Sequence, residues 1–102
     1  MKRKSILIVD DDPNVRYAVR MIFEKEGYIV LEADGGQRGI EVFGREHPEV
    51  VFLDVTMPDM SGLDVLKELK EDSDVPIIVI TGYGTMVTAI KAVQLGAYEY
   101  VT

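Results

Sequence analysis

The sequence predicts an α/β domain built on a parallel β-sheet, and three observations support this prediction. Short apolar runs alternate along the chain with stretches of helical periodicity, which is the rhythm of β-α-β units. Two of these runs, residues 6–9 and 50–53, are rich in β-branched residues, as strands buried on both faces of a parallel sheet usually are. Acidic residues follow both runs at once, so we expect polar groups where the strands end.

Length and composition limit the chain to a single domain, expected to span residues 1–102. The 102 residues are 47% hydrophobic and 28% charged, which suits one buried core and not a disordered chain. The net charge of −7 disfavours nucleic acid or an anionic membrane as a direct partner. No apolar run approaches the roughly 20 residues that span a bilayer, and no signal peptide is evident, so the cytoplasm is the expected location.

The first expected unit is a strand over residues 5–9 and a helix that begins near Pro13. Proline suits the first turn of a helix, and we interpret the preceding Asp12 as the N-cap of this helix. Gly27 follows as the expected stop. One face of the helix carries apolar residues at helical spacing, which are Val15, Val19, Ile22 and Phe23.

The second unit is a strand over residues 28–33 and a helix over residues 36–47. We interpret residues 35–36 as the turn that enters this helix. The helix is weak, because Gly39 and Gly44 each cost up to about 1 kcal/mol relative to alanine in a helix interior. The apolar side chains expected to face inward are Ile40 and Phe43.

The C-terminal half continues the same alternation. Strands are expected over residues 50–53, 75–80 and 97–101, each a short apolar run. Helices are expected over residues 62–70 and 85–95. The first of these helices has a buried leucine stripe, made of Leu63, Leu66 and Leu69.

Polar groups follow several of these strands and are expected to meet in one pocket. Asp10 and Asp11 follow the first strand, Asp54 the third and Thr81 the fourth, and ligands of open α/β sheets bind beyond the carboxyl ends of the strands. Clustered carboxylates repel one another unless a cation joins them, and Mg²⁺ is the natural partner. One aspartate that faces two others suits phosphoryl transfer, with Asp54 as the nucleophile that forms an acyl phosphate. Thr81 could donate its hydroxyl to a phosphoryl oxygen.

Four segments in order resemble a known family: ILIVDDDP, VVFLDVTMPDMSGLDVL, VPIIVITGYGT and LGAYEYVT. Over essentially its whole length the chain resembles the receiver domain of bacterial two-component response regulators. The resemblance implies a CheY-like, flavodoxin-like doubly wound sheet of five parallel strands in the order 2-1-3-4-5. The sequence segments TGYGTMVTAI and LGAYEYVT are most similar to those of NtrC-type receivers, which precede sigma-54-dependent transcription activators.

The resemblance implies a role for each residue of the acidic pocket. Asp54 accepts a phosphoryl group from a sensor histidine kinase or a phosphotransfer protein. Asp11 binds Mg²⁺, or alternatively Mn²⁺, directly, and Asp10 binds it through water. Asp54 and the backbone carbonyl of Thr56 are further metal ligands. The chain is then not an enzyme, beyond self-phosphorylation and self-dephosphorylation.

The resemblance also implies residues that read the phosphorylated state. Thr81 is the switch hydroxyl and Tyr100 the switch aromatic, while Thr56 and Tyr83 tune dephosphorylation. Phosphorylation is expected to shift the face formed by residues 85–95 and 97–101 and thereby control an output, namely transcription.

The chain departs from the family at its end. It stops at Thr102, before the position at which the family carries a lysine and before the last helix. We therefore expect a C-terminally truncated receiver whose sheet leaves part of one apolar face uncovered. We also expect a second copy to cover that face, as a homodimer or as a dimer that exchanges elements.

Two competing functions fail on particular residues, and a third stays open. A flavodoxin needs a loop rich in hydroxyls and glycine after its first strand, but here that loop holds three aspartates. A phosphatase of the haloacid-dehalogenase type needs a second aspartate two residues after the nucleophile, where this chain has Thr56. The open alternative is a module that binds itself or a partner without phosphorylation.

Overall fold

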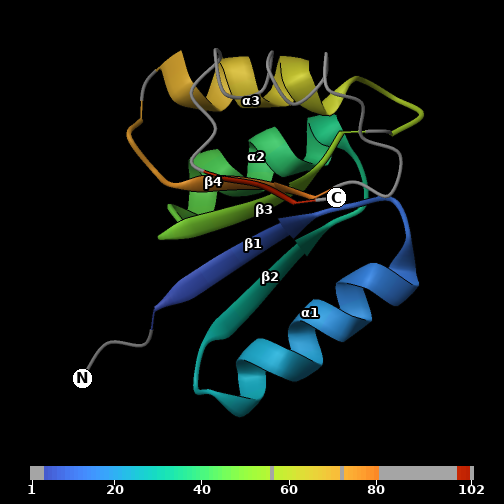
Figure 1. Ribbon diagram of the computed structural model, residues 1–102. Helices are drawn as coiled ribbons and strands as arrows, with labels where there is room; N and C mark the ends of the chain where they lie inside the picture. Colours follow the sequence, from blue (N-terminus) through green and yellow to red (C-terminus); the bar gives the residue numbers. More distant parts are fainter. Residues whose placement is uncertain (1–3, 56, 72, 81–98, 102) are drawn as a thin grey trace.

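The computed structural model describes residues 4–55, 57–71, 73–80 and 99–101. For residues 99–101 it describes only the backbone. These residues form a parallel sheet with helices on both faces (Figure 1). The helix expected over residues 85–95 lies outside the described residues.

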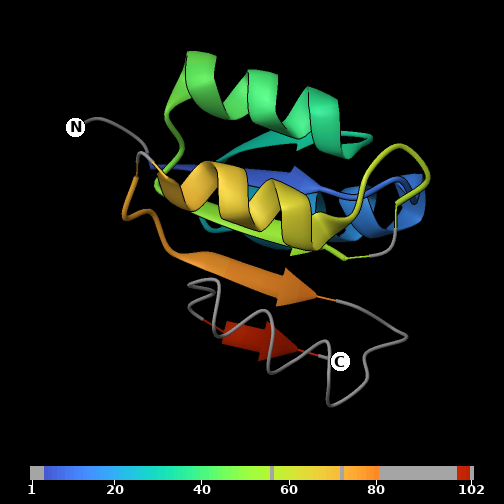
Figure 2. The ribbon, with the colours of Figure 1, turned by 90° about the horizontal axis from the view of Figure 1, so that it is seen from above.

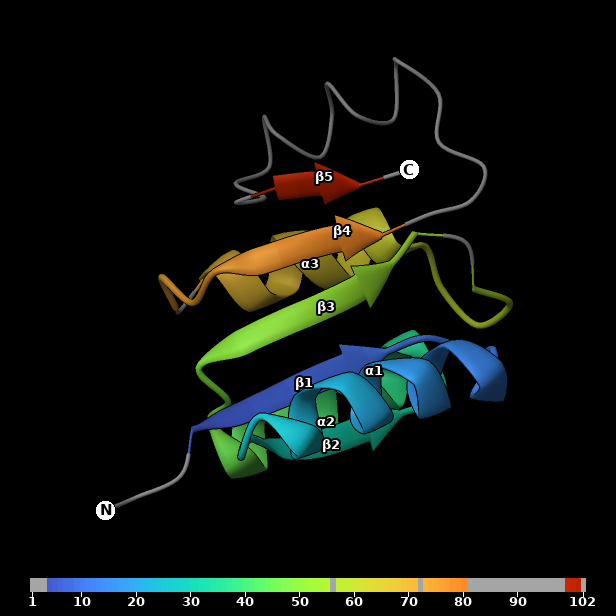
Figure 3. The same cartoon turned by 60° about the horizontal axis from the view of Figure 1, so that its bottom comes forward.

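The five described strands lie in the order β2-β1-β3-β4-β5, and every adjacent pair is parallel, as expected. Val9 at the end of β1 is aligned with Ala33 on one side and with Leu53 on the other. The carboxyl ends of the three strands therefore lie side by side at one edge of the sheet (Figure 3). The strands are β1 (Ser5–Val9), β2 (Ile29–Ala33), β3 (Val50–Asp54), β4 (Ile77–Ile80) and β5 (Glu99–Val101).

Three described helices cover the sheet from opposite sides. Helix α1 (Pro13–Lys25) lies on one face, and α2 (Gly36–Glu46) and α3 (Gly62–Glu71) lie on the other (Figures 1 and 2). Gly27 follows α1 with φ +92°, a conformation that favours glycine, so it ends the helix as expected. None of the helices in the described part of the chain is long and apolar enough to cross a bilayer.

Each face of the sheet packs its own apolar cluster. The larger cluster fills the space under α2 and α3, and its members with no exposed surface are Leu7, Val9, Val51, Leu53, Val65, Leu66, Ile77 and Val79. The smaller cluster lies under α1 and contains Ile8, Val19 and Val30, with Val15, Phe23 and Phe52 against them. Because alternate residues of each strand enter opposite clusters, the central strands are apolar on both faces, which explains their continuous apolar runs.

Two strands begin later than the sequence predicts, because local hydrogen bonds take their first residues. The N–H of Tyr28 donates to the Phe23 carbonyl of α1 at 3.0 Å, so β2 begins at Ile29. The N–H of Val75 donates to the Ser73 hydroxyl at 3.1 Å, and the following proline has no N–H, so β4 begins at Ile77. Strand β5 is described over Glu99–Val101, and the two residues expected to precede these in the strand, 97 and 98, lie outside the described residues.

The prediction that Ile22 belongs to the buried face of α1 is wrong. Ile22 is 59% exposed, whereas Val19 is buried and Phe23 is half-buried. The helix is turned so that Arg16, which lies three residues before Val19 on a neighbouring part of the helix surface, also faces the sheet. Ile22 lies on the opposite border of the apolar stripe and therefore remains in solvent.

Candidate functional site

Three carboxylates meet at the carboxyl edge of the sheet. Asp10 follows β1 directly, Asp11 comes next, and Asp54 is the last residue of β3. One oxygen of each lies within 4.8 Å of the others. Asp10 is only 5% exposed, Asp54 is half-buried and Asp11 is exposed, so the cluster runs from the sheet edge out to solvent. The structure thus brings together three of the residues that the sequence singles out.

Asp10 is held in an environment that disfavours its charge. Burial raises the pKa of Asp10 above its ordinary value, and the negative charges of Asp11 and Asp12 raise it further. The Asp12 N–H, which donates to Asp10 Oδ1 at 2.9 Å, and a hydrogen bond with the Asp54 side chain act in the opposite direction. A cation among these carboxylates would relieve the repulsion, and oxygen ligands of this kind suit Mg²⁺. The residues present therefore fit a magnesium ion.

Asp12 caps α1, which confirms its interpretation from the sequence. Its side chain accepts a hydrogen bond from the Asn14 N–H at 2.9 Å, and its backbone is extended. The capping oxygen is committed to the helix, so Asp12 stands apart from the three clustered carboxylates.

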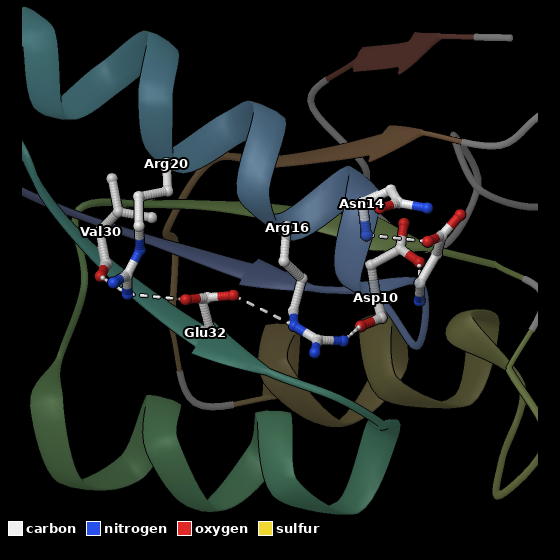
Figure 4. A network of polar contacts seen from close by, with 7 residues as sticks. Asp10, Asn14, Arg16, Arg20, Val30 and Glu32 are labelled. Carbon is white, nitrogen blue, oxygen red and sulfur yellow. Dashed lines mark hydrogen bonds and ion pairs between the residues drawn. The ribbon is translucent and has the colours of Figure 1, made fainter.

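An arginine that the sequence analysis did not single out holds the backbone of Asp10 (Figure 4). Arg16 donates from Nη1 to the Asp10 carbonyl oxygen at 2.7 Å and from Nε to Glu32 Oε1 at 3.1 Å. The other oxygen of Glu32 lies 2.7 Å from Arg20 Nη2, which also donates to the Val30 carbonyl at 3.3 Å. A signal was available, since Arg16 and Arg20 are four residues apart on a helix and Glu32 interrupts an apolar strand.

The loop that follows Asp54 is fastened to its surroundings at three points. Met57 is buried in the large core cluster. Asp59 accepts hydrogen bonds from the Gly36 and Gln37 N–H groups of α2, each at 3.0 Å. The Gly62 N–H donates to the Val55 carbonyl at 2.8 Å and closes the loop. The sequence analysis missed Asp59, because its partners lie more than twenty residues earlier in the chain.

The other predicted site residues are not tested. Thr56, Thr81 and Tyr83 lie outside the described residues. Only the backbone of Tyr100 is described, in β5, where it is aligned with Val79 of β4. The roles that the family resemblance implies for these four residues stay predictions.

Comparison with known proteins identifies the family. The family model described as "Response regulator receiver domain" matches residues 6–102. The chain is 38% identical over 99 residues to the probable transcriptional regulator ycf27 of Guillardia theta, covering 97% of this chain and 39% of that protein. It is 38% identical over 97 residues to the regulatory protein AtoC of Escherichia coli (strain K12), covering 94% of this chain and 21% of AtoC. The chain thus spans less than half of the length of these curated relatives.

Solved structures agree with the fold. A CheY-like response regulator receiver domain protein from Methanospirillum hungatei JF-1 superposes with a TM-score of 0.93 at 31% identity, covering 98% of this chain and 81% of that chain. The response regulator protein TrrA from Thermotoga maritima, solved in complex with Mg²⁺ and BeF, superposes with a TM-score of 0.87 at 35% identity, covering 97% of this chain and 85% of that chain. The family match spans nearly all of the sequence. The chain belongs to the response regulator receiver domain family.

Proposed function

We propose that this chain accepts a phosphoryl group on Asp54 in a magnesium-dependent reaction and thereby controls an output. The observation that carries the proposal is the meeting of Asp10, Asp11 and Asp54, whose oxygens lie within 4.8 Å of one another at the carboxyl edge of the sheet. Membership of the receiver family supports the same function. The phosphoryl donor would be a sensor histidine kinase or a phosphotransfer protein.

In the proposed reaction, a carboxylate oxygen of Asp54 forms a bond to phosphorus. The bond from phosphorus to the imidazole nitrogen of the donor breaks, and its electron pair stays on that nitrogen. Mg²⁺, when bound, would neutralise the phosphoryl oxygens and the surrounding carboxylates. The chain itself supplies the acceptor and positions it, so we do not regard it as an enzyme beyond self-phosphorylation and self-dephosphorylation.

Asp11 is proposed as a direct ligand of Mg²⁺ and Asp10 as a ligand through water. The exposure of Asp11 and the burial of Asp10 are in keeping with this division. Asp54 and the Thr56 carbonyl are the further proposed ligands. The all-oxygen donor set favours Mg²⁺, with Mn²⁺ as the alternative.

Thr81 and Tyr100 are proposed to transmit the phosphorylated state, and Thr56 and Tyr83 to tune its lifetime. A phosphoryl group adds charge and acceptor oxygens, which would draw the Thr81 hydroxyl inward and bias one of two packings of the face beyond β4. The relatives named as transcriptional regulators support transcription as the output.

One alternative from the sequence analysis remains, in which the chain binds itself or a partner without phosphorylation. The expected dimer, simple or with exchanged elements, is not tested by the described residues and stays a prediction.

The proposal is tested by the intact mass of the protein after incubation with acetyl phosphate and Mg²⁺. We expect a gain of one phosphoryl group that disappears without Mg²⁺ and in Asp54→Ala. Far-ultraviolet circular dichroism would verify that the variant is folded. A folded wild-type protein that gains no mass would contradict the proposal and favour the alternative.

A further inference from the structure

We propose that Asp59 is a positioning residue, which ties the loop after Asp54 to helix α2 and thereby keeps the carboxylate cluster competent to bind Mg²⁺. This inference rests on the proposed function of the cluster. It concerns a residue outside the cluster, whose own oxygens are committed to backbone groups of another element.

Both carboxylate oxygens of Asp59 cap the N-terminus of α2, although Asp59 lies more than twenty residues later in the chain. Helix α2 begins after Gly35, which has no side chain with which to cap the first N–H groups. Asp59 replaces the missing cap, since Oδ1 accepts from the Gly36 N–H and Oδ2 from the Gln37 N–H, each at 3.0 Å. A negative charge at the positive end of a helix is stabilising in its own right. One carboxylate thus serves the helix and restrains the loop at the same time.

The two glycines at the start of α2 have no room for a side chain of their own beside the loop. A Cβ atom at Gly35 would approach Asp59 Oδ1 to 3.0 Å, and its three nearest neighbours are all atoms of the Asp59 side chain. A Cβ atom at Gly36 would lie 2.8 Å from both Met60 Sδ and Val65 Cγ2. The two glycines at the start of α2 therefore admit the loop side chains of Asp59 and Met60, which explains why the entrance to this helix is a glycine pair.

The loop held by Asp59 closes directly on the backbone of Asp54. The Gly62 N–H donates to the Val55 carbonyl at 2.8 Å. A Cβ atom at Gly62 would clash with the Asp54 carbonyl oxygen, so the far end of the loop already touches the acceptor residue. A loop released at Asp59 loses its hydrogen bonds to α2 and keeps only the packing of Met60 against Gly36, and the change reaches Asp54 through this short closed segment. Outer contacts of this kind orient metal ligands.

Electrostatics favour the ionised form of Asp59 in this contact. The hydrogen bonds from Gln37 and Gly36 hold the pKa of Asp59 below its ordinary value. The carboxylate therefore accepts from both N–H groups throughout the neutral pH range.

The first test measures Mg²⁺ binding by the Asp59→Ala variant of the full chain. The measurement is an NMR titration with MgCl₂ at constant ionic strength. We expect the Kd for Mg²⁺ to rise by roughly 10-fold, as is common for supporting contacts of metal ligands. The Mg²⁺ concentration that half-saturates phosphorylation by acetyl phosphate should rise to match, while the rate at saturating Mg²⁺ changes little. Glu41→Ala is the charge-matched control, because Glu41 is an exposed acid of α2 that pairs only with Arg38 among the described residues.

A second variant separates the tether from the cap. Gly35→Ser combined with Asp59→Ala places a capping hydroxyl on α2 itself, in the space that the Asp59 side chain vacates. The extended backbone at Gly35, with φ −169°, accepts any residue. We expect this double variant to regain resistance to urea without Mg²⁺, relative to Asp59→Ala, but not to regain the Kd for Mg²⁺.

The outcomes distinguish the inference from the proposed function. A wild-type Kd in Asp59→Ala, or in Asp59→Asn if the alanine variant does not fold, would overturn the positioning role. Recovery of both urea resistance and Mg²⁺ affinity in the double variant would reduce Asp59 to a helix cap and also overturn it. A wild-type chain that binds Mg²⁺ but takes no phosphoryl group would contradict the proposed function, while a raised Kd in Asp59→Ala would still support the tether.

Discussion

Asp10 shows how a single residue can be unfavourable for folding and useful for binding. Its carboxylate is almost fully buried beside two other acids, and its raised pKa records the cost of keeping it ionised there. The carboxylate cluster was predictable, because residues that directly follow parallel strands must gather at one edge of the sheet. Asp59 was not predictable, because its partners are backbone groups of α2 that only the folded chain brings near.

Replacement of Asp10 by asparagine should separate these two effects. The introduced amide would keep an oxygen for the Asp12 N–H but remove the charge, so we expect Asp10→Asn to raise the free energy of unfolding in Mg²⁺-free buffer at pH 7, by on the order of 1 kcal/mol. The stabilisation that Mg²⁺ gives the wild type should be lost. Urea unfolding with and without MgCl₂ measures both, with Asp74→Asn as the exposed control. A less stable Mg²⁺-free Asp10→Asn variant would contradict this account.

At the scale of elements, helix α2 shows why sequence rules misjudge individual glycines. Gly39 and Gly44 receive the same penalty from helix propensity, but they face different surroundings. A Cβ atom at Gly39 would lie 2.9 Å from both Cγ atoms of buried Val9, whereas nothing lies within 4 Å of a Cβ atom at Gly44. The first glycine lets α2 approach β1 closely, and the second only weakens the helix.

Alanine substitutions at these two positions should therefore change stability in opposite directions. Gly39→Ala would press on a stiff, fully buried valine, and we expect a loss of about 1–3 kcal/mol of unfolding free energy. Gly44→Ala meets open space and should gain up to about 1 kcal/mol. Chemical denaturation of the two variants makes the comparison. Equal effects would show that helix propensity, and not packing against β1, governs both sites.

The bounds of the elements were predictable where local chemistry sets them. The N-cap at Asp12 and the stop at Gly27 depend on neighbouring residues, and both were expected. The start of β4 and the exposure of Ile22 depend on the Ser73 hydroxyl and on the rotation of α1 over the sheet. Apolar periodicity does not contain that information.

At the scale of the molecule, the linked carboxylates should make the stability conferred by Mg²⁺ depend on pH. In the proposed function Mg²⁺ binds the ionised cluster, and at ten times its Kd it would add about 1.4 kcal/mol. The ionised form of Asp10 lowers metal-free stability above its raised pKa, and this cost disappears as the pH falls through that pKa. The increment from Mg²⁺ should therefore be present at pH 7–8 and vanish as the pH approaches the ordinary carboxyl range of about 4.

Thermal unfolding between pH 8 and pH 4, with MgCl₂ or with NaCl of equal ionic strength, measures this increment. Because the chain carries a net charge of −7, the NaCl series is needed to remove general screening. A Tm increment from Mg²⁺ that is the same at both ends of the range would show that the cation acts elsewhere than on the carboxylate cluster.

The hydrogen bond from Arg20 to the Val30 carbonyl also bears on whether the edge of the sheet can pair with another copy of the chain. Ile29 donates its N–H to Lys4 and the Ala33 carbonyl accepts from Asp10, so both residues face β1, and the alternating Val30 points its carbonyl to the open side of the sheet. β2 is the edge strand there, and unpaired carbonyls on an edge invite a strand from another chain. The Arg20 guanidinium occupies that carbonyl and puts a bulky cation beside it. We therefore expect the arginine to disfavour pairing of this edge with a strand of another copy.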